Sequence, residues 1–89
     1  MLNIVDSALK HGFTDGELRR IWDTVPEDSV VRVRHSKQPP HYMMVGYTGQ
    51  GRPVELIAYT DGFDWWLFHA YTPITSGFRR EYVRNGGVL

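Results

Sequence analysis

The sequence contains no cysteine, which excludes disulfide bonds and thiolate metal sites and is typical of a cytoplasmic protein. It also lacks long hydrophobic runs, because an apolar stretch such as Trp65–Phe68 is far shorter than the roughly 20 residues of a membrane helix. Met1 is not followed by a basic start and an apolar segment, so we expect no secretory signal. A chain of 89 residues has room for one hydrophobic core, which predicts a single domain over residues 1–89.

Net charge is absent as well, since ten Lys and Arg residues balance ten Asp and Glu residues. The charges are unevenly distributed: residues 1–31 carry six acids and three bases, whereas residues 32–54 carry four cations and no acid. Eight of the ten cations are arginine, whose planar guanidinium binds phosphate in a bidentate manner. This distribution is equally compatible with a phosphate-binding surface and with ordinary solvated faces.

Two helices are predicted at the start of the chain. The first extends over Leu2–Lys10, with apolar side chains four residues apart on one face and Gly12 as its stop signal. The second begins after Thr14, which forms a capping box with Glu17, and ends at Pro26. Its apolar residues have helical spacing and are Leu18, Ile21, Trp22 and Val25.

From residue 30 the hydrophobic pattern alternates, which predicts strands instead of helices. Four strands joined by Pro- or Gly-containing turns are expected to form an antiparallel meander: Val30–Arg34, His41–Tyr47, Val54–Tyr59 and Asp64–Tyr71. A short final helix follows, capped by Thr75 or Ser76 and ended by Gly86. The predicted fold class is therefore α+β with the element order ααββββα.

The last predicted strand is apolar or aromatic on both faces, since neighbouring side chains of a strand point to opposite sides. Its two faces are expected to be Trp66, Phe68 and Ala70, and Trp65, Leu67, His69 and Tyr71. One of the two adjacent tryptophans is expected in the core, and the other to be free for a nucleic-acid base, a partner or the C-terminal tail.

The histidines and arginines are suited to chemistry on a phosphodiester. Metal-free RNA cleavage needs a base for the 2′-hydroxyl, an acid for the leaving 5′-oxygen and cations around the phosphate. Histidine titrates in the range that either proton transfer needs, so we predict His69 as the acid or base. Arginine keeps its charge, so we predict that Arg52 and either Arg79 or Arg80 hold the phosphate.

Each candidate also has a structural interpretation. His69 is equally explained as an imidazole packed among aromatic rings, and we interpret His11 as a helix-end residue that bonds the last free carbonyls. Lys10 is interpreted as a solvated side chain. His35 and His41 flank a Pro-Pro turn, but no further ligand pattern accompanies them, so we expect neither a metal nor a cofactor.

Four short motifs follow one another along the chain: Ser7-Ala8-x-Lys10-His11-Gly12, Gly51-Arg52, Leu67-Phe68-His69-Ala70, and an Arg-rich helix with Arg79, Arg80 and Tyr82. In these motifs the chain resembles the BrnT-like toxins of the RelE/ParE superfamily of type II toxin–antitoxin systems. The resemblance implies a metal-independent endoribonuclease that cuts messenger RNA, free or on the ribosome, and is inhibited by a cognate antitoxin. It also implies a compact sheet with two helices on one face and the active surface on the other.

The candidate site has two sets of residues. The predicted catalytic set is His69, Arg52, Arg79, Arg80 and Tyr82. The predicted RNA-binding set is Lys10, Arg32, Arg34 and Tyr71, and Tyr71 or Tyr82 supplies a second hydroxyl or stacks a base. The expected partners are the antitoxin and messenger RNA, with no membrane and no small-molecule cofactor.

Two other functions remain open. The neutral charge and Tyr71 favour a non-catalytic binding module of the same fold, either a degenerate toxin that still binds an antitoxin or a toxin that inhibits gyrase. A small interaction domain that covers a partner's helix or strand with its open aromatic face is the third interpretation.

Overall fold

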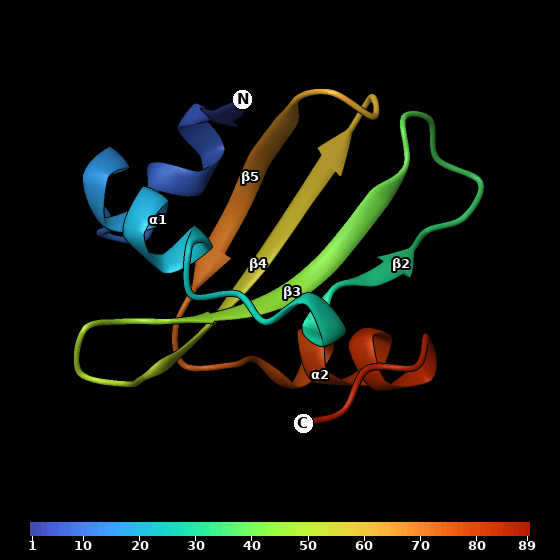
Figure 1. Ribbon diagram of the computed structural model, residues 1–89. Helices are drawn as coiled ribbons and strands as arrows, with labels where there is room; N and C mark the ends of the chain where they lie inside the picture. The colour runs from blue at the N-terminus through green and yellow to red at the C-terminus, as the bar shows by residue number, and fades with distance from the viewer.

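The computed structural model describes residues 1–89 as a five-stranded sheet with helices on both faces (Figure 1). In space the strands are ordered β1-β5-β4-β3-β2; β1 runs parallel to β5, and the other pairs are antiparallel. The strands are β1 (Leu2–Ile4), β2 (Val31–Val33), β3 (His41–Tyr47), β4 (Pro53–Thr60) and β5 (Trp65–Tyr71). The helices are the 3₁₀ helices η1 (Asp6–Leu9) and η2 (Glu27–Ser29) and the α-helices α1 (Asp15–Trp22) and α2 (Ser76–Arg84).

The start of the chain corrects the predicted fold. The helix expected over Leu2–Lys10 is wrong, because this segment forms the strand β1 and then the single turn η1. A helix of nine residues is marginal by itself, whereas the free edge of β5 offers unpaired backbone groups that β1 satisfies. The protein is therefore α+β with a five-stranded mixed sheet and two α-helices, and the predicted order ααββββα with a four-stranded antiparallel meander does not hold.

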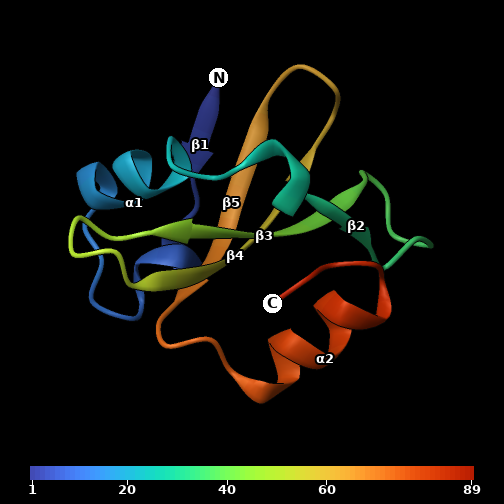
Figure 2. The same ribbon diagram turned by 60° about the horizontal axis from the view of Figure 1, so that its bottom comes forward.

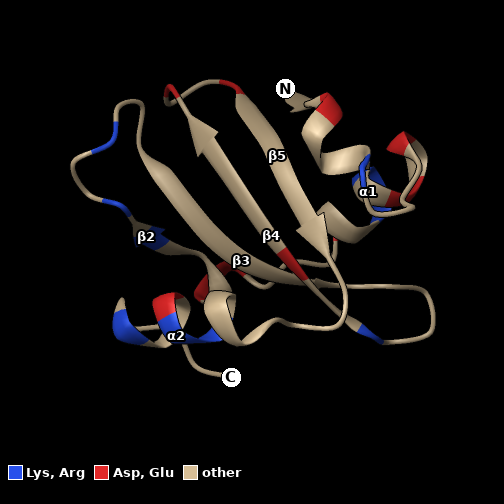
Figure 3. Cartoon of the chain, turned by 180° about the vertical axis from the view of Figure 1, so that it is seen from behind, with Lys and Arg blue, Asp and Glu red and all other residues tan.

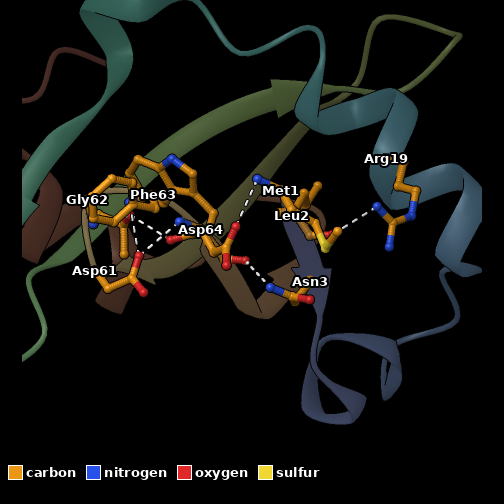
Figure 4. A network of polar contacts seen from close by, with 10 residues as sticks. Met1, Leu2, Asn3, Arg19, Asp61, Gly62, Phe63 and Asp64 are labelled. Carbon is orange, nitrogen blue, oxygen red and sulfur yellow. Dashed lines mark hydrogen bonds and ion pairs between the residues drawn. The ribbon is translucent and has the colours of Figure 1, made fainter.

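Backbone and side-chain contacts fix β1 against its neighbours (Figure 4). The Asn3 side-chain amide donates to the Trp65 carbonyl at 3.2 Å, and the Trp65 N–H donates to the Met1 carbonyl at 2.9 Å. From the other side, the guanidinium of Arg19 on α1 donates to the Leu2 carbonyl at 2.9 Å. These bonds involve residues more than 15 positions apart, so the local sequence pattern does not report them.

The start of α1 and its cap are confirmed, but the helix ends at Trp22 and not at Pro26, so Val25 lies beyond it. The Thr14 hydroxyl accepts the Glu17 N–H at 3.1 Å, and the Glu17 carboxylate accepts the Thr14 N–H at 2.9 Å. That backbone hydrogen bond lowers the pKa of Glu17 below its usual value, because it favours the ionised form. The helix then places Leu18 and Ile21 in the core.

The four later strands and α2 lie where the alternating pattern and the cap signals predict them. Strand β3 has the predicted bounds, and the other three strands differ by one residue at one or both ends. Thr75 is the N-cap of α2, since its hydroxyl accepts the Phe78 N–H at 3.3 Å.

A β-bulge in β5 changes which side chains share a face. Ile57 of β4 pairs with His69 and the next residue, Ala58, pairs with Leu67, so Phe68 is an extra residue in β5. Leu67 therefore lies on the α1 side of the sheet, while Phe68 packs on the α2 side. The expected strand faces, with Leu67 and His69 together, are wrong because the bulge interrupts the period of two.

Two hydrophobic clusters lie on opposite sides of the sheet, as the positions of α1 and α2 in Figure 2 show. The cluster under η1 and α1 contains Ala8, Leu18, Ile21, Met44, Val54, Leu56, Ala58, Leu67 and Ala70. The cluster under α2 contains Val33, Met43, Val45, Ile57, Phe78 and Tyr82. This second cluster is the smaller, and α2 leaves part of its sheet face uncovered at the end near the β4–β5 turn (Figures 1 and 3).

Candidate functional site

A cleft of about 520 Å³ lies on the α2 side of the sheet, between α2 and the turn that follows η1. Its floor comes from β3, β4 and β5, and its two walls come from residues far apart in sequence. The lining residues that carry polar chemistry are Ser7, Lys10, His11, Arg34, Glu55, His69 and Glu81. The cleft therefore joins two imidazoles, two carboxylates and two cations.

The bulge in β5 turns His69 into this cleft. In a regular strand His69, two residues after Leu67, would share the α1 side with it, but the bulge at Phe68 moves the His69 side chain to the α2 side. In the structure the His69 Nε2 atom lies 2.8 Å from the Glu55 Oε2 atom, and the imidazole is 31% exposed. The other ring nitrogen, Nδ1, makes no hydrogen bond within the chain and is free to meet a ligand.

Glu55 is the one charged side chain buried in the core, with 2% of its surface exposed. Its Oε1 atom accepts hydrogen bonds from the Thr75 N–H at 2.6 Å and from the Thr75 hydroxyl at 2.9 Å. Because Thr75 caps α2, the carboxylate also faces the positive end of that helix. These contacts hold a carboxylate at a fixed point behind His69 (the acidic segment within β4 in Figure 3).

The contact with Glu55 determines what His69 can do. An ionised carboxylate accepts hydrogen bonds only, so Nε2 carries the proton and Nδ1 has the free lone pair in the neutral ring. A carboxylate behind an imidazole also stabilises the imidazolium that forms when the ring takes up a proton. His69 is thus oriented as a proton acceptor toward the open cleft.

A second imidazole lies beside the first. The ring centroids of His11 and His69 are 6.1 Å apart, and the His11 ring stands edge-on against Tyr71 at 4.8 Å. Gly12, with a φ of 91°, allows the sharp turn after His11. The Ser7 hydroxyl donates to the Phe68 carbonyl at 2.5 Å, which ties η1 to the bulge and holds this wall of the cleft in place.

Two cations border the imidazoles. Lys10 lines the cleft, is exposed and forms no ion pair within the chain. Arg34 lies on the opposite wall, where its guanidinium donates to both carboxylate oxygens of Glu81 at 3.2 and 3.3 Å. An exposed pair of this kind is weak, so a bound phosphate has access to the guanidinium.

Three predicted phosphate ligands lie elsewhere. Arg79 and Arg80 line a separate shallow surface on the outer side of α2 together with Arg84, and Arg52 lies in the β3–β4 turn (Figure 3). Neither this turn nor the outer side of α2 contributes to the cleft that contains His69. The predicted grouping of these arginines with His69 is therefore not found, and Lys10 and Arg34 are the cations that the fold brings there.

The remaining predicted residues have mixed placements. Tyr82 is 1% exposed, its hydroxyl donates to the Ser29 carbonyl at 2.6 Å, and burial raises its pKa, so its contacts are those of a core residue. Arg32 pairs with Tyr42 across β2 and β3 and does not line the cleft. Tyr71 lies against His11 at the edge of the site.

Comparison with protein-family models, with curated proteins and with solved structures finds no match for this chain. No group of three or more His, Cys, Asp or Glu side chains is arranged to hold a metal ion. Neither α-helix has the length and hydrophobicity that crossing a bilayer requires.

Sequence reasoning missed two residues of the site, and a signal existed for each. Glu55 is a single acid within the apolar run of β4, and a charge at such a position needs buried partners. His11 belongs to a noted motif, but its helix-end interpretation rested on a helix that does not form. The contact that brings His11 to His69 spans 58 positions and depends on β1 pairing with β5.

Proposed function

We propose that this protein is a metal-independent endoribonuclease and that the cleft holding His69 and His11 is its active site. The observation that carries the proposal is the pair of imidazoles 6.1 Å apart, one of them held from behind by a buried carboxylate. Two separate proton-transfer groups are what metal-free cleavage of RNA needs, because the attacking and leaving oxygens lie on opposite sides of the phosphorus.

In the proposed reaction, His69 acts as the base and His11 as the acid. The Nδ1 atom of His69 takes the proton of the 2′-hydroxyl as the 2′-oxygen bonds to phosphorus. The bond from phosphorus to the 5′-oxygen then breaks, and the leaving oxygen receives the proton of the His11 imidazolium. The products are a 2′,3′-cyclic phosphate and a free 5′-hydroxyl, while Lys10 and Arg34 stabilise the charge on the phosphate oxygens.

The biological role that we propose comes from the sequence resemblance. The motifs shared with BrnT-like toxins support a cytoplasmic toxin that cuts messenger RNA and is inhibited by a cognate antitoxin. The sheet topology differs from the one that the resemblance implied, so this part of the proposal rests on the residue motifs alone.

The test is cleavage of single-stranded RNA by the purified protein, measured in EDTA without ribosomes and in Mg²⁺ buffer with ribosomes. We expect His69→Gln to lower the rate about 10²- to 10⁴-fold, the usual contribution of a general acid or base. The matched control is His35→Gln, because His35 is an exposed histidine of the β2–β3 loop outside the cleft. No cutting in either setting, or equal rates for His69→Gln and wild type, would reject the proposal.

A second candidate is a binding module without catalysis, and the outer side of α2 favours it. Arg79, Arg80 and Arg84 surround the exposed Val83 there, which suits an acidic, amphipathic partner. A folded His69→Gln variant that arrests growth as strongly as wild type would support this candidate over the nuclease.

A further inference from the structure

A row of aromatic rings crosses the uncovered part of the sheet on the same face as the cleft. The rings of His41 and Tyr59 are stacked with centroids 5.4 Å apart, and those of Tyr59 and Trp66 are stacked at 5.5 Å with planes only 13° apart. The ring centroid of Phe68 lies 5.7 Å from that of His41 and 5.8 Å from that of Tyr59. We call these four residues of β3, β4 and β5 the aromatic ladder.

The ladder is not part of either hydrophobic core. Of its members only Phe68 packs against the cluster under α2, and all four side chains remain partly exposed. The helix α2 lies at the opposite end of the sheet from the β4–β5 turn, next to which Tyr59 and Trp66 lie (Figures 1 and 3). Four adjoining aromatic rings at the surface keep apolar area in contact with water. A contiguous exposed apolar patch of this kind marks a binding site.

The ladder is continuous with the proposed active site. Phe68 belongs to the ladder and also lines the cleft, where His69 follows it in β5. Trp66, the far ring on this strand, is three residues from His69, which corresponds to about 10 Å along a strand. A ligand that places a phosphate between His11 and His69 therefore has its next groups over the ladder.

The chemistry of the ladder favours flat, unpaired rings as its ligand. It is made of aromatic rings with no aliphatic member, and successive bases of single-stranded nucleic acid stack on such rings regardless of sequence. The neighbouring β2–β3 loop carries the exposed cation Lys37, and residues 30–54 contain no acid. At the end of the ladder next to the β4–β5 turn lies the acidic residue Asp61. Its carboxylate accepts hydrogen bonds from the backbone N–H groups of Phe63 and Asp64.

We infer that the aromatic ladder is a base-stacking subsite that binds unpaired nucleotides of a single RNA strand next to the bond in the cleft. The inference rests on the proposed function for its position and adds to it the substrate class, single-stranded RNA longer than a dinucleotide. It also assigns Trp66 as the tryptophan that is free for a base, while Trp65 packs with Trp22 and Tyr42 on the α1 side.

The experiment separates binding from cleavage. A fluorescently labelled oligonucleotide with 2′-O-methyl groups has no free 2′-hydroxyl and is not cut, so its anisotropy reports binding alone. We expect Tyr59→Leu and Trp66→Leu each to weaken binding roughly 5- to 150-fold, the range for losing one base–aromatic stack. Trp66→Phe keeps a ring and is expected to bind close to wild type, which distinguishes stacking from misfolding.

Two controls complete the design. Phe63→Leu removes an aromatic ring that is 88% exposed at the β4–β5 turn but outside the ladder, and we expect unchanged binding. His69→Gln is expected to retain binding of the methylated strand while losing cleavage of unmodified RNA. A dinucleotide in the cleft meets Phe68 but does not extend to Trp66, so Trp66→Leu is expected to lower the cutting rate of longer RNA more than that of a dinucleotide.

The possible results separate the two proposals. Ladder variants that fold and bind like wild type, absence of any binding, or equal binding of duplex and single-stranded RNA would overturn the ladder subsite. Binding that depends on the ladder without any cleavage of unmodified RNA would support the subsite and reject the nuclease. If the ladder variants cut long and short substrates at the wild-type rate, the nuclease proposal stands and the subsite is rejected.

Discussion

At the scale of single residues, Glu55 connects the fold to the site. One carboxylate oxygen accepts two hydrogen bonds from Thr75 at the start of α2, and the other accepts the His69 Nε2–H. Three hydrogen bonds compensate for the burial of this carboxylate. Removal of its charge changes which atoms carry the protons in the hydrogen bonds between Glu55, Thr75 and His69. This makes Glu55 a positioning residue that acts through His69.

The variant Glu55→Gln tests this role. Gln retains an acceptor for Thr75, but its NH₂ group turned toward His69 forces Nε2 to accept, so Nδ1 carries the proton and loses its function as a base. We expect kcat to fall about 10²- to 10⁴-fold with little change in KM. Thermal unfolding close to wild type would separate this effect from loss of fold, and an unchanged kcat would refute it.

Tyr82 predicts how stability depends on alkaline pH. Burial raises its pKa above the ordinary value of 10.0, so the unfolded chain loses this proton at lower pH than the folded protein does. The free energy of unfolding is therefore expected to be constant with respect to Tyr82 below about pH 10 and to fall as pH rises above that value.

The matched variant is Tyr82→Phe. It removes the hydroxyl that donates to the Ser29 carbonyl and is expected to cost about 1 kcal/mol of unfolding free energy at neutral pH. Denaturant titrations at neutral and alkaline pH measure both effects. If the variant lost as much stability as wild type on going to alkaline pH, Tyr82 would not be the responsible group.

At the scale of elements, α1 packs tightly against the sheet at Gly46 of β3. A Cβ atom there would lie 2.7 Å from both the side chain and the backbone carbonyl of Ile21, and the backbone cannot rotate away. We expect Gly46→Ala to destabilise the protein by about 1 to 3 kcal/mol through overpacking. Gly49→Ala is the control, because Gly49 has no atom near its Cβ position; equal melting temperatures for the two variants would contradict this packing.

The elements that sequence predicted well are those with local signals. The capping box of Thr14 and Glu17, the cap Thr75 and the alternating runs of β3, β4 and β5 each depend on residues a few positions apart. Strand β1 was missed because its three residues form a strand only where β5 provides an edge. The bulge at Phe68 was missed because it is a property of the β4–β5 pair and not of either strand.

In the candidate site, too, the features with local sequence signals were predicted and those that depend on contacts between strands were not. His69 was predicted from its motif, but the direction of its side chain depends on the bulge, and its partner Glu55 comes from the neighbouring strand. Arg79 and Arg80 were predicted for the site although Phe78 and Tyr82, at i and i+4, already define the buried side of α2. The helical period alone therefore assigns those two arginines to the outer side.

At the scale of the whole molecule, the fold forms two separate surfaces that carry cations, although the net charge of the chain is zero. One is the cleft with its two imidazoles, Lys10 and Arg34, next to the aromatic ladder; the other is the basic outer side of α2. The proposed RNA site and the proposed partner surface therefore use different residues and do not overlap.

The central claim is that His69 and His11 work together as base and acid on one phosphodiester. The most direct test is the pH dependence of kcat/KM for cleavage of single-stranded RNA in EDTA, measured for wild type and His11→Gln. The account predicts a bell-shaped profile for wild type, because one imidazole must be neutral and the other protonated, and loss of the alkaline limb in the variant. A His11→Gln profile with the shape and height of wild type would contradict the claim.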